Sequence, residues 1–337
     1  MKTLLEPKFQ IHFDKSISRF FDHKNVLITG ASGFLASGIL KILATTKANV
    51  HCLTRDLMKS FSIPWASSSI NWYEYSAFSP EDWAELLGKT DVVFHLAAQT
   101  SAQTADESPL DDYEANVLFT LKLLEGFKSV QKRPIFVFAS TASIFGIPEN
   151  LPVNENAKDQ PHSYYCLHKK IAESYVTSFS DKGWLRGTSL RLCNVYGPGK
   201  PSSKNDRGVL NQMIQKACRE EPIVLYGNGK FIRDYLYIED AALAFLKAAM
   251  SMPKILGQTF VIGSGQGTSI RQAARIIQTT AKNHFGREIE IQEIEHASEE
   301  LSRRNFIANF QLFSSLTSWQ PQVSLEKGIF QTFCDQL

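Results

Sequence analysis

Short apolar segments alternate with amphipathic ones through the first two thirds of the chain. The segment at 134–139 is apolar throughout, as expected for a strand that is covered on both faces of a parallel sheet. Apolar residues recur at helical spacing in 34–43 and in the longer segment from Leu110 to Val130. Strands are predicted at 25–29, 50–54, 90–98, 134–139 and 188–192. This alternation predicts an α/β fold built on a doubly wound parallel sheet.

The pattern changes after residue 200, where a polar loop at 202–208 begins a second, smaller lobe. The segments predicted there are helices at 209–219, 238–250 and 270–285, strands at 223–225 and 288–292, and a turn at 227–229. We therefore divide the chain into an N-terminal extension, 1–24, a first domain, mainly 25–200, and a smaller C-terminal α/β lobe, mainly 201–337. Some strands and helices of this last part can return to the first domain.

Composition and charge exclude several classes of protein. The 36 basic and 34 acidic side chains leave a net charge of +2, which gives no electrostatic reason to expect nucleic acid or a membrane surface as a partner. No apolar run reaches the ~20 residues that a membrane span needs. The five cysteines lack CxxC spacing, which argues against a zinc site or a disulfide framework. The first 24 residues lack the apolar core of a secretory signal, so we expect a cytoplasmic protein.

A glycine turn follows the first predicted strand. Gly30 and Gly33 end this strand and open the helix at 34–43, and Ala36 is the third small residue of the pattern. Glycines allow the backbone to approach a pyrophosphate, and the free N–H groups at the start of the helix attract it. The order strand, glycine turn and helix therefore predicts a dinucleotide site in a Rossmann-type domain.

The end of the second strand indicates which dinucleotide binds. An acidic residue at this place would hold the ribose 2′-hydroxyl of NAD, whereas this chain has Thr54 and Arg55. Without the carboxylate a 2′-phosphate is not repelled, and a guanidinium can bind it. The sequence thus favours NADP. The alternative is that Arg55 is solvated and Asp56 binds NAD.

Tyr165 and Lys169 are candidates for acid and base chemistry. They lie four residues apart in a predicted helix and therefore project from one face of it. The pKa of a free tyrosine, near ~10, is too high for a base at neutral pH, and a neighbouring ammonium lowers that pKa. Ser140 and Thr141 follow the strand at 134–139, where hydroxyl groups of an open α/β sheet reach the ligand crevice. His95 is interpreted as a structural residue.

Ordered motifs along the chain resemble a known family. They are 29–34 (TGASGF), 95–98 (HLAA), 116–117 (NV), the Thr141 segment, 165–169 (YCLHK), 191–199 (RLCNVYGPG), 233–240 (RDYLYIED), 262–265 (IGSG) and 319–321 (WQP). With these residues the chain resembles the extended short-chain dehydrogenase/reductase superfamily, specifically its NAD(P)-dependent nucleotide-sugar epimerase/dehydratase family, UDP-glucose 4-epimerase-like. The match runs from about Lys24 to the C-terminus.

The resemblance implies a role for each matching residue. Tyr165 is the general base and acid, Lys169 binds the nicotinamide ribose, and Thr141 hydrogen-bonds the sugar hydroxyl that is oxidised. The residues implied to bind the cofactor are Gly30, Ser32, Gly33, Phe34, Leu35, Thr54, Arg55, Leu96, Ala97, Ala98, Tyr165 and Lys169. Those implied to bind the nucleotide sugar are Gln99, Thr141, Asn194, Arg207, Tyr226 and Arg233. For Arg233 the alternative is an ion pair with Asp234 or Glu239.

Departures from the family pattern reduce the number of reactions that we expect. In the 4,6-dehydratases the two positions after the catalytic threonine are acidic, and the decarboxylating xylose synthases favour Glu at the second, whereas this chain has Ala142 and Ser143. We therefore expect a 4-epimerase first. An NADPH-dependent 4-keto-6-deoxysugar reductase is the first alternative, because it fits the Arg55 interpretation. A non-catalytic NADP(H)-sensing protein is the second.

The resemblance also implies a homodimer. In this family the helices that correspond to Leu110 to Val130 and to the Tyr165 segment form a four-helix bundle between two subunits. Both segments carry apolar faces here, which could instead face the core.

Overall fold

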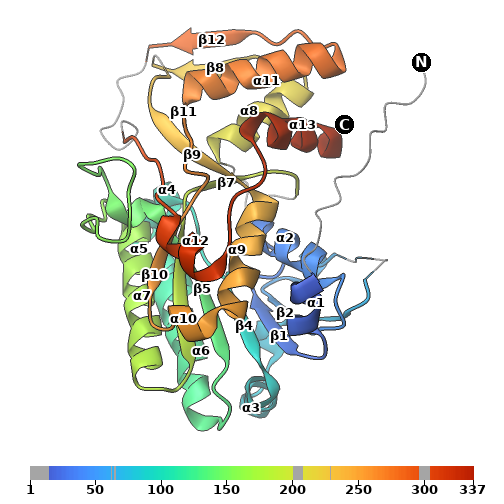
Figure 1. The fold of residues 1–337 in the computed structure, drawn as a ribbon, viewed down its shortest axis with the longest axis vertical. Coiled ribbons are helices and arrows are strands. Elements are labelled where there is room, and N and C mark those ends of the chain that lie inside the picture. The colour runs from blue at the N-terminus through green and yellow to red at the C-terminus, as the bar shows by residue number, and fades with distance from the viewer. Residues whose placement is uncertain (1–14, 62, 64–65, 200–207, 228, 296–303) are drawn as a thin grey trace.

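A seven-stranded parallel sheet forms the centre of the larger domain (Figure 1). The computed structural model of the chain describes residues 15–61, 63, 66–199, 208–227, 229–295 and 304–337. The strands of the sheet are β1 (Asn25–Thr29), β2 (Asn49–Thr54), β3 (Ser69–Glu74), β4 (Val92–His95), β5 (Ile135–Thr141), β6 (Arg186–Leu192) and β10 (Thr259–Ile262). Each neighbouring pair is parallel. The predicted Rossmann-type doubly wound sheet is confirmed.

The strand order, β10-β6-β5-β4-β1-β2-β3, reverses direction at β1, which lies between β2 and β4. In an open α/β sheet the crevice beyond such a reversal is where ligands bind. The edge strands β3 and β10 were not predicted. β3 alternates between exposed and half-buried residues and so lacks the apolar run that marks the inner strands.

Helices cover both faces of this sheet. Val26 and Ile28 of β1 pack into a core with α1 (Lys15–Phe21), α2 (Phe34–Leu43), α9 (Ile238–Met250), α10 (Met252–Ile255) and α12 (Gln311–Thr317). Leu27 of the same strand faces the opposite core, which contains α3 (Pro80–Lys89), α6 (Phe119–Gly126) and α7 (Tyr164–Asp181). The helix α4 (Ala102–Glu107) also lies against α7. Part of the predicted N-terminal extension therefore belongs to the core, since α1 buries Ile17 and Phe21 there.

One predicted helix has a different location from the one expected. The segment 238–250 does form a helix, α9, but it packs against α2 and β5 in the larger domain and not in the second lobe. Its residues are buried on almost every side, including Ala241, Leu243 and Phe245. A helix that is apolar all round has to lie inside a core, and the thick core beside the sheet provides that place.

The smaller lobe packs three helices against short strands (top of Figure 1). The helices are α8 (Val209–Cys218), α11 (Ile270–Phe285) and α13 (Leu325–Gln336). The strands are β7 (Asn194–Tyr196), β9 (Ile232–Tyr237) and β11 (Gly267–Ser269) in one sheet, and β8 (Ile223–Tyr226) and β12 (Ile291–Ile294) in another. The strand predicted at 288–292 is wrong in its bounds, because pairing with β8 begins at Ile291 opposite Ile223.

The long helix predicted from Leu110 to Val130 is not one regular α-helix. It consists of α5 (Pro109–Tyr113), a π turn at Glu114–Leu118, α6, and a 3-10 turn at Phe127–Ser129. The π turn carries the buried Asn116, and such turns often occur at functional sites. On the outer side of this region Leu110, Tyr113, Tyr164 and Leu167 are exposed. The homodimer stays a prediction.

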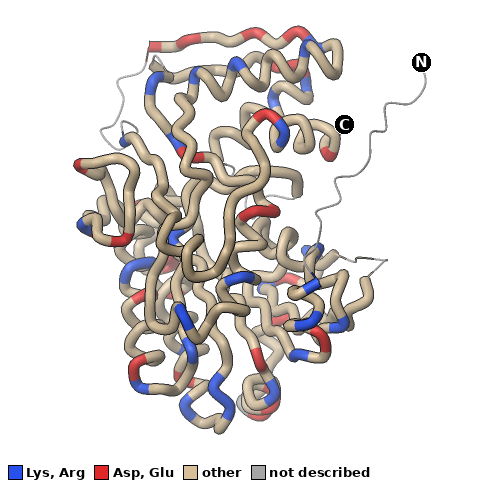
Figure 2. The backbone as a smooth tube through the Cα atoms, in the orientation of Figure 1, with Lys and Arg blue, Asp and Glu red and all other residues tan. Residues whose placement is uncertain are grey.

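Charged residues are distributed over the whole fold. Figure 2 shows basic and acidic positions interspersed over both lobes of the described chain. Within the described residues, none of the helices is both long and apolar enough to span a bilayer.

Candidate active site

A cavity of about 1550 Å³ begins at the C-terminal ends of β1, β2, β4 and β5 and continues into the smaller lobe, where Asn194, Asn211 and Gln336 line it. Pockets for single small molecules are typically about 300–1,000 Å³, so this one has room for a dinucleotide and a second ligand. The predicted site residues that line it are Gly30, Ser32, Gly33, Phe34, Leu35, Thr54, Arg55, Leu96, Ala97, Ala98, Gln99, Thr141, Tyr165, Lys169, Asn194 and Arg233.

Two predicted substrate residues are not among them. Tyr226, at the end of β8, is 67% exposed and does not line this cavity. Arg207 lies outside the described residues. For Tyr226 the cause lies in the strand, because β8 pairs with β12 on the outer side of the smaller lobe.

The glycine turn after β1 lies directly against the loop that follows β4. Gly30 has φ +67°, and a Cβ at this residue would lie 2.7 Å from the backbone nitrogen of Ala97. Any side chain there would clash with the end of β4. Gly33 is the N-cap of α2, a helix of ten residues. The close approach of the two loops and the free N–H groups of α2 fit the pyrophosphate of a dinucleotide.

Two cationic side chains line the cavity just after β2. Arg55 is exposed, lines the cavity and takes part in none of the ion pairs among the described residues. Lys59, which the sequence reasoning missed, lines the cavity as well. The Asp56 carboxylate accepts a hydrogen bond from the backbone nitrogen of Met58 (2.9 Å) and lies 3.8 Å from the Lys59 ammonium. Asp56 itself also lines the cavity, so its carboxylate lies at the same place as Arg55 and Lys59.

The structure brings together the three predicted catalytic residues. Tyr165 and Lys169 project from α7, which begins after the cap residue Ser163. Thr141 is the last residue of β5, and its Oγ1 accepts a hydrogen bond from the backbone nitrogen of Ser143 (3.1 Å). The Thr141 hydroxyl can still donate its own proton, and all three residues line the cavity.

Lys169 is a buried cation. Its side chain is only 2% exposed, and Nζ lies 4.1 Å from the centre of the Phe138 ring. Burial lowers the pKa of Lys169 to about 7, while the negative charges of Glu173 and Asp112 act in the opposite direction. In this environment of low dielectric constant a positive charge acts strongly on a neighbouring phenol.

His95 is a structural residue, as expected. Its Nδ1 lies 2.7 Å from Thr29 Oγ1, and its Nε2 lies 2.8 Å from Thr120 Oγ1. Thr120 donates to the carbonyl of Asn116, so the proton of the ring is assigned to Nε2. Burial, followed by the charge of Lys169, lowers the pKa of His95 to about 3. The ring is neutral at physiological pH.

A buried carboxylate connects the cavity wall to α7. Asp112 Oδ1 accepts hydrogen bonds from Gln99 Nε2 (2.9 Å) and Asn116 Nδ2 (2.9 Å), and Oδ2 lies 2.6 Å from His168 Nδ1. Gln99 Nε2 also donates to the carbonyl of Ser101. The amide of Gln99 therefore holds the wall of the cavity, although the residue was predicted only as a substrate contact.

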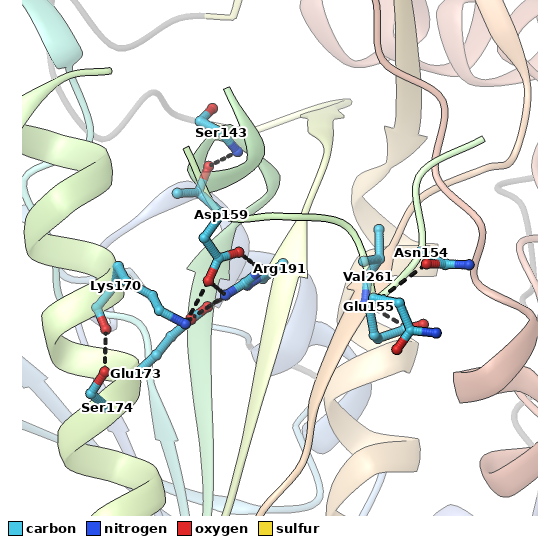
Figure 3. Close-up of polar contacts among 11 residues, drawn as sticks. Ser143, Asn154, Glu155, Asp159, Lys170, Glu173, Ser174, Arg191 and Val261 are labelled. Atoms are coloured by element: carbon cyan, nitrogen blue, oxygen red, sulfur yellow. Dashed lines mark hydrogen bonds and ion pairs between the residues drawn. The ribbon is translucent and has the colours of Figure 1, made fainter. Parts of the chain in front are cut away.

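A second charged cluster holds α7 against β6 (Figure 3). The Arg191 guanidinium donates two hydrogen bonds to the Glu173 carboxylate (2.9 and 2.8 Å) and two to Asp159 (2.5 and 3.0 Å). Lys170 Nζ lies 2.6 Å from Asp159 Oδ2. Glu173 is one helical turn beyond Lys169, so this cluster fixes the part of the helix that carries Tyr165 and Lys169.

Two arginines, Arg233 and Arg304, line the cavity. Arg233, on β9, donates through Nη1 to the carbonyl oxygens of Ile232 and Arg304. Burial, followed by the charge of Arg304, lowers the pKa of Arg233. The Asp234 carboxylate accepts hydrogen bonds from the backbone nitrogens of Ser264, Gly265 and Ala308, which disfavours the alternative that Asp234 pairs with Arg233.

Arg304 was not found by sequence reasoning. Its Nη2 donates to Ser143 Oγ (3.0 Å), and both residues line the cavity. In the sequence Arg304 only follows another arginine, with no motif around it, so no local signal marks it as a site residue.

Comparison with known proteins gives a consistent result. The model of the NAD dependent epimerase/dehydratase family matches residues 26–263. A UDP-glucose 4-epimerase from Mycolicibacterium smegmatis is 28% identical over 312 residues, which cover 91% of this chain and 96% of the relative. The crystal structure of UDP-glucose 4-epimerase from Thermotoga maritima with UDP-glucose is similar, with a TM-score of 0.79, 29% identity, and coverage of 92% of this chain and 98% of that one. The Thermus thermophilus UDP-glucose 4-epimerase complex with NAD has a TM-score of 0.78, 26% identity, and coverage of 93% and 98%.

Proposed function

The chain belongs to the NAD dependent epimerase/dehydratase family, and we propose that it is an NAD(P)-dependent 4-epimerase of a nucleotide diphosphate sugar. The observation that carries the proposal is the meeting of Thr141, Tyr165 and Lys169 on the wall of one cavity that also contains the Gly30 turn. The relatives named above, which are UDP-glucose 4-epimerases, support the substrate class.

Tyr165, Lys169 and Thr141 have different roles in the proposed reaction. A bound nicotinamide dinucleotide supplies a reversible acceptor for the hydrogen and electron pair on C4 of the sugar. Tyr165, as phenolate, takes the proton of the C4 hydroxyl, and the buried ammonium of Lys169 stabilises that phenolate. Thr141 donates a hydrogen bond to the C4 oxygen. A 4-keto sugar results, and after it rotates Tyr165 returns the proton while the hydrogen returns to the other face of C4, so no net oxidation occurs.

The nucleotide end of the substrate is assigned to the smaller lobe. Arg233 is held by carbonyl oxygens at one edge of its guanidinium and lines the cavity, where it binds the diphosphate through charge-assisted hydrogen bonds. Asn194 Nδ2 donates to the carbonyl of Asp234, the chain neighbour of Arg233 (3.2 Å), and this contact supports the assignment of Asn194 to the sugar phosphate.

A second candidate is an NADPH-dependent reductase of a 4-keto-6-deoxysugar. Arg55 and Lys59 favour it, because two cations at the adenosine ribose suit a cofactor that carries a 2′-phosphate and is exchanged in each turnover. A non-catalytic sensor is disfavoured, because Thr141, Tyr165 and Lys169 are all present and share the cavity.

Turnover experiments distinguish these candidates. The purified protein is incubated with UDP-sugars and catalytic amounts of NAD or NADP, and the sugar epimers are separated by chromatography while the reduced nicotinamide is followed by absorbance. We expect isomerisation without added reductant. Consumption of added NADPH in proportion to product would support the reductase instead. No conversion of any nucleotide sugar, including 4-keto sugars, would support the sensor.

The choice of cofactor gives a separate prediction. Replacing Arg55 with alanine is expected to raise the Kd of NADP about 10-fold, because an exposed charge-assisted contact to the 2′-phosphate is lost. The Kd of NAD should stay within about threefold. Fluorescence titration of both cofactors measures this, with Arg19→Ala as the control, an exposed arginine of the same domain that does not line the cavity. Equal weakening of both cofactors would contradict the preference for NADP.

A further inference from the structure

Arg304 extends between the two ends of the substrate cavity. Its carbonyl oxygen accepts a hydrogen bond from Arg233, and its guanidinium donates to Ser143 Oγ at 3.0 Å. The backbone nitrogen of Ser143 donates in turn to Thr141 Oγ1 at 3.1 Å. The backbone of Arg304 therefore lies near the guanidinium of Arg233, and the head of its side chain lies near Thr141.

The guanidinium of Arg304 is a partly buried positive charge, and its hydrogen-bond partner, the Ser143 hydroxyl, is neutral. Burial lowers the pKa of Arg304, and the nearby Cys166 side chain acts in the opposite direction. An arginine in a protein nevertheless remains protonated. Arg304 takes part in none of the ion pairs between described residues, whereas Arg191 pairs with Asp159 and Glu173. A desolvated guanidinium is costly unless an anion compensates it, so the cavity is complementary to an anion at this point.

The position of the anion follows from the shape of a pyranose ring. In the proposed reaction Thr141 contacts the oxygen on C4. The diphosphate is attached to C1, across the ring from C4, and Arg233 is assigned to it. An anion beside Thr141 is therefore not the diphosphate but a substituent on one of the two ring carbons next to C4. In hexoses and hexuronic acids C3 carries a neutral hydroxyl, whereas C5 carries the C6 group, which is a carboxylate in a hexuronic acid. The nearby chain residues Ala142 and Ser143 carry no charge that could take its place.

We propose that the substrate is a nucleotide diphosphate hexuronic acid, and that Arg304 and Ser143 bind its C6 carboxylate. The inference rests on the proposed function, which places C4 at Thr141. A carboxylate accepts two parallel hydrogen bonds from the planar guanidinium, whereas the neutral C6 hydroxyl of a hexose leaves the charge uncompensated. Rotation of the keto sugar exchanges the C3 and C5 sides of the ring, so the carboxylate contacts Arg304 in one of the two bound orientations.

Binding measurements on Tyr165→Phe protein, loaded with cofactor, test the site without turnover. Isothermal titration calorimetry compares UDP-glucuronic acid with UDP-glucose, and GDP-mannuronic acid with GDP-mannose. At least one hexuronate is expected to bind about 10- to 100-fold more tightly than its matched hexose. Adding Arg304→Gln should remove this preference while the affinity for the hexose stays within about threefold. Arg304→Lys, which keeps the charge and loses the planar fork, should keep part of the preference.

Three outcomes would overturn the proposal. These are equal affinities within both pairs, no binding of either hexuronate, or a loss of hexose and free UDP affinity in Arg304→Gln as large as the loss for the hexuronate. The last outcome would assign the guanidinium to the diphosphate. Turnover of the same sugars by the unsubstituted protein is measured separately. Epimerisation of hexoses without a hexuronate preference leaves the proposed function intact, whereas a preference in binding without any turnover removes the function and keeps the carboxylate site.

Discussion

Tyr165→Phe is expected to lower kcat by about 10²- to 10⁴-fold, the range that a positioned general acid and base contributes. Phenylalanine keeps the ring and removes the one oxygen that can accept the C4 proton. The buried ammonium of Lys169 remains in place, so the Kd of the cofactor should change little. Single-turnover reduction of bound cofactor by the sugar measures the effect on the chemical step.

The neighbouring tyrosine provides a matched control for this experiment. Tyr164 precedes Tyr165 on α7 but is 48% exposed and does not line the cavity. Tyr164→Phe should therefore keep a rate within about twofold of the original, as surface substitutions usually have small effects. If Tyr165→Phe turned over an accepted sugar as fast as Tyr164→Phe, the assignment of the base would be wrong.

Arg191→Met is expected to lower the free energy of unfolding by about 3–5 kcal/mol, as measured for broken ion pairs in protein interiors. The side chains of Arg191 and Glu173 are only 5% and 3% exposed. Without the guanidinium the buried Glu173 carboxylate keeps, among the residues that the structure describes, only Lys170, at 3.7 Å, as its ion-pair partner. The urea concentration at the unfolding midpoint, multiplied by the slope of the transition, gives the free energy of unfolding of each protein. The difference between the two values is the predicted loss.

Two further variants separate the cost of a broken pair from the loss of a side chain. Replacing both partners, as Arg191→Met with Glu173→Leu, should recover much of the lost stability, because no unpaired charge is left in the interior. Glu85→Gln breaks the exposed ion pair with Lys89 and should cost less than about 1 kcal/mol. A loss for Arg191→Met as small as that for Glu85→Gln would show that the cluster does not stabilise the helix.

The division of the chain at residue 200 shows where local patterns stop being informative. Helix 238–250 has the predicted bounds of α9, yet it packs on the central sheet. Periodicity reports that a segment is helical and how much of its surface is apolar. It does not report which of two cores receives that surface, because the choice depends on the shapes of the cores.

The candidate site shows the same limit at the level of side chains. Gly30 and the pair Tyr165 and Lys169 could be recognised because their geometry depends on neighbours in the chain, a turn in one case and one helical turn in the other. Arg304 and Ser143 are separated by 161 residues, and His168 and Asp112 by 56. Contacts over such distances depend on how whole elements pack, and no local motif records them.

The sequence by itself therefore determined the α/β class and, through the family resemblance, the family, and it predicted the phosphate turn and the acid and base pair. These features follow from periodicity, backbone freedom and residue spacing, which are local properties of a chain. The tertiary structure alone decided that Lys59 lies beside Asp56 on the cavity wall, that Gln99 and Asp112 hold that wall, and that the Arg304 guanidinium donates to Ser143. Each of these is a choice among possible partners for a charged or polar group, and only the folded chain limits which partners lie within reach.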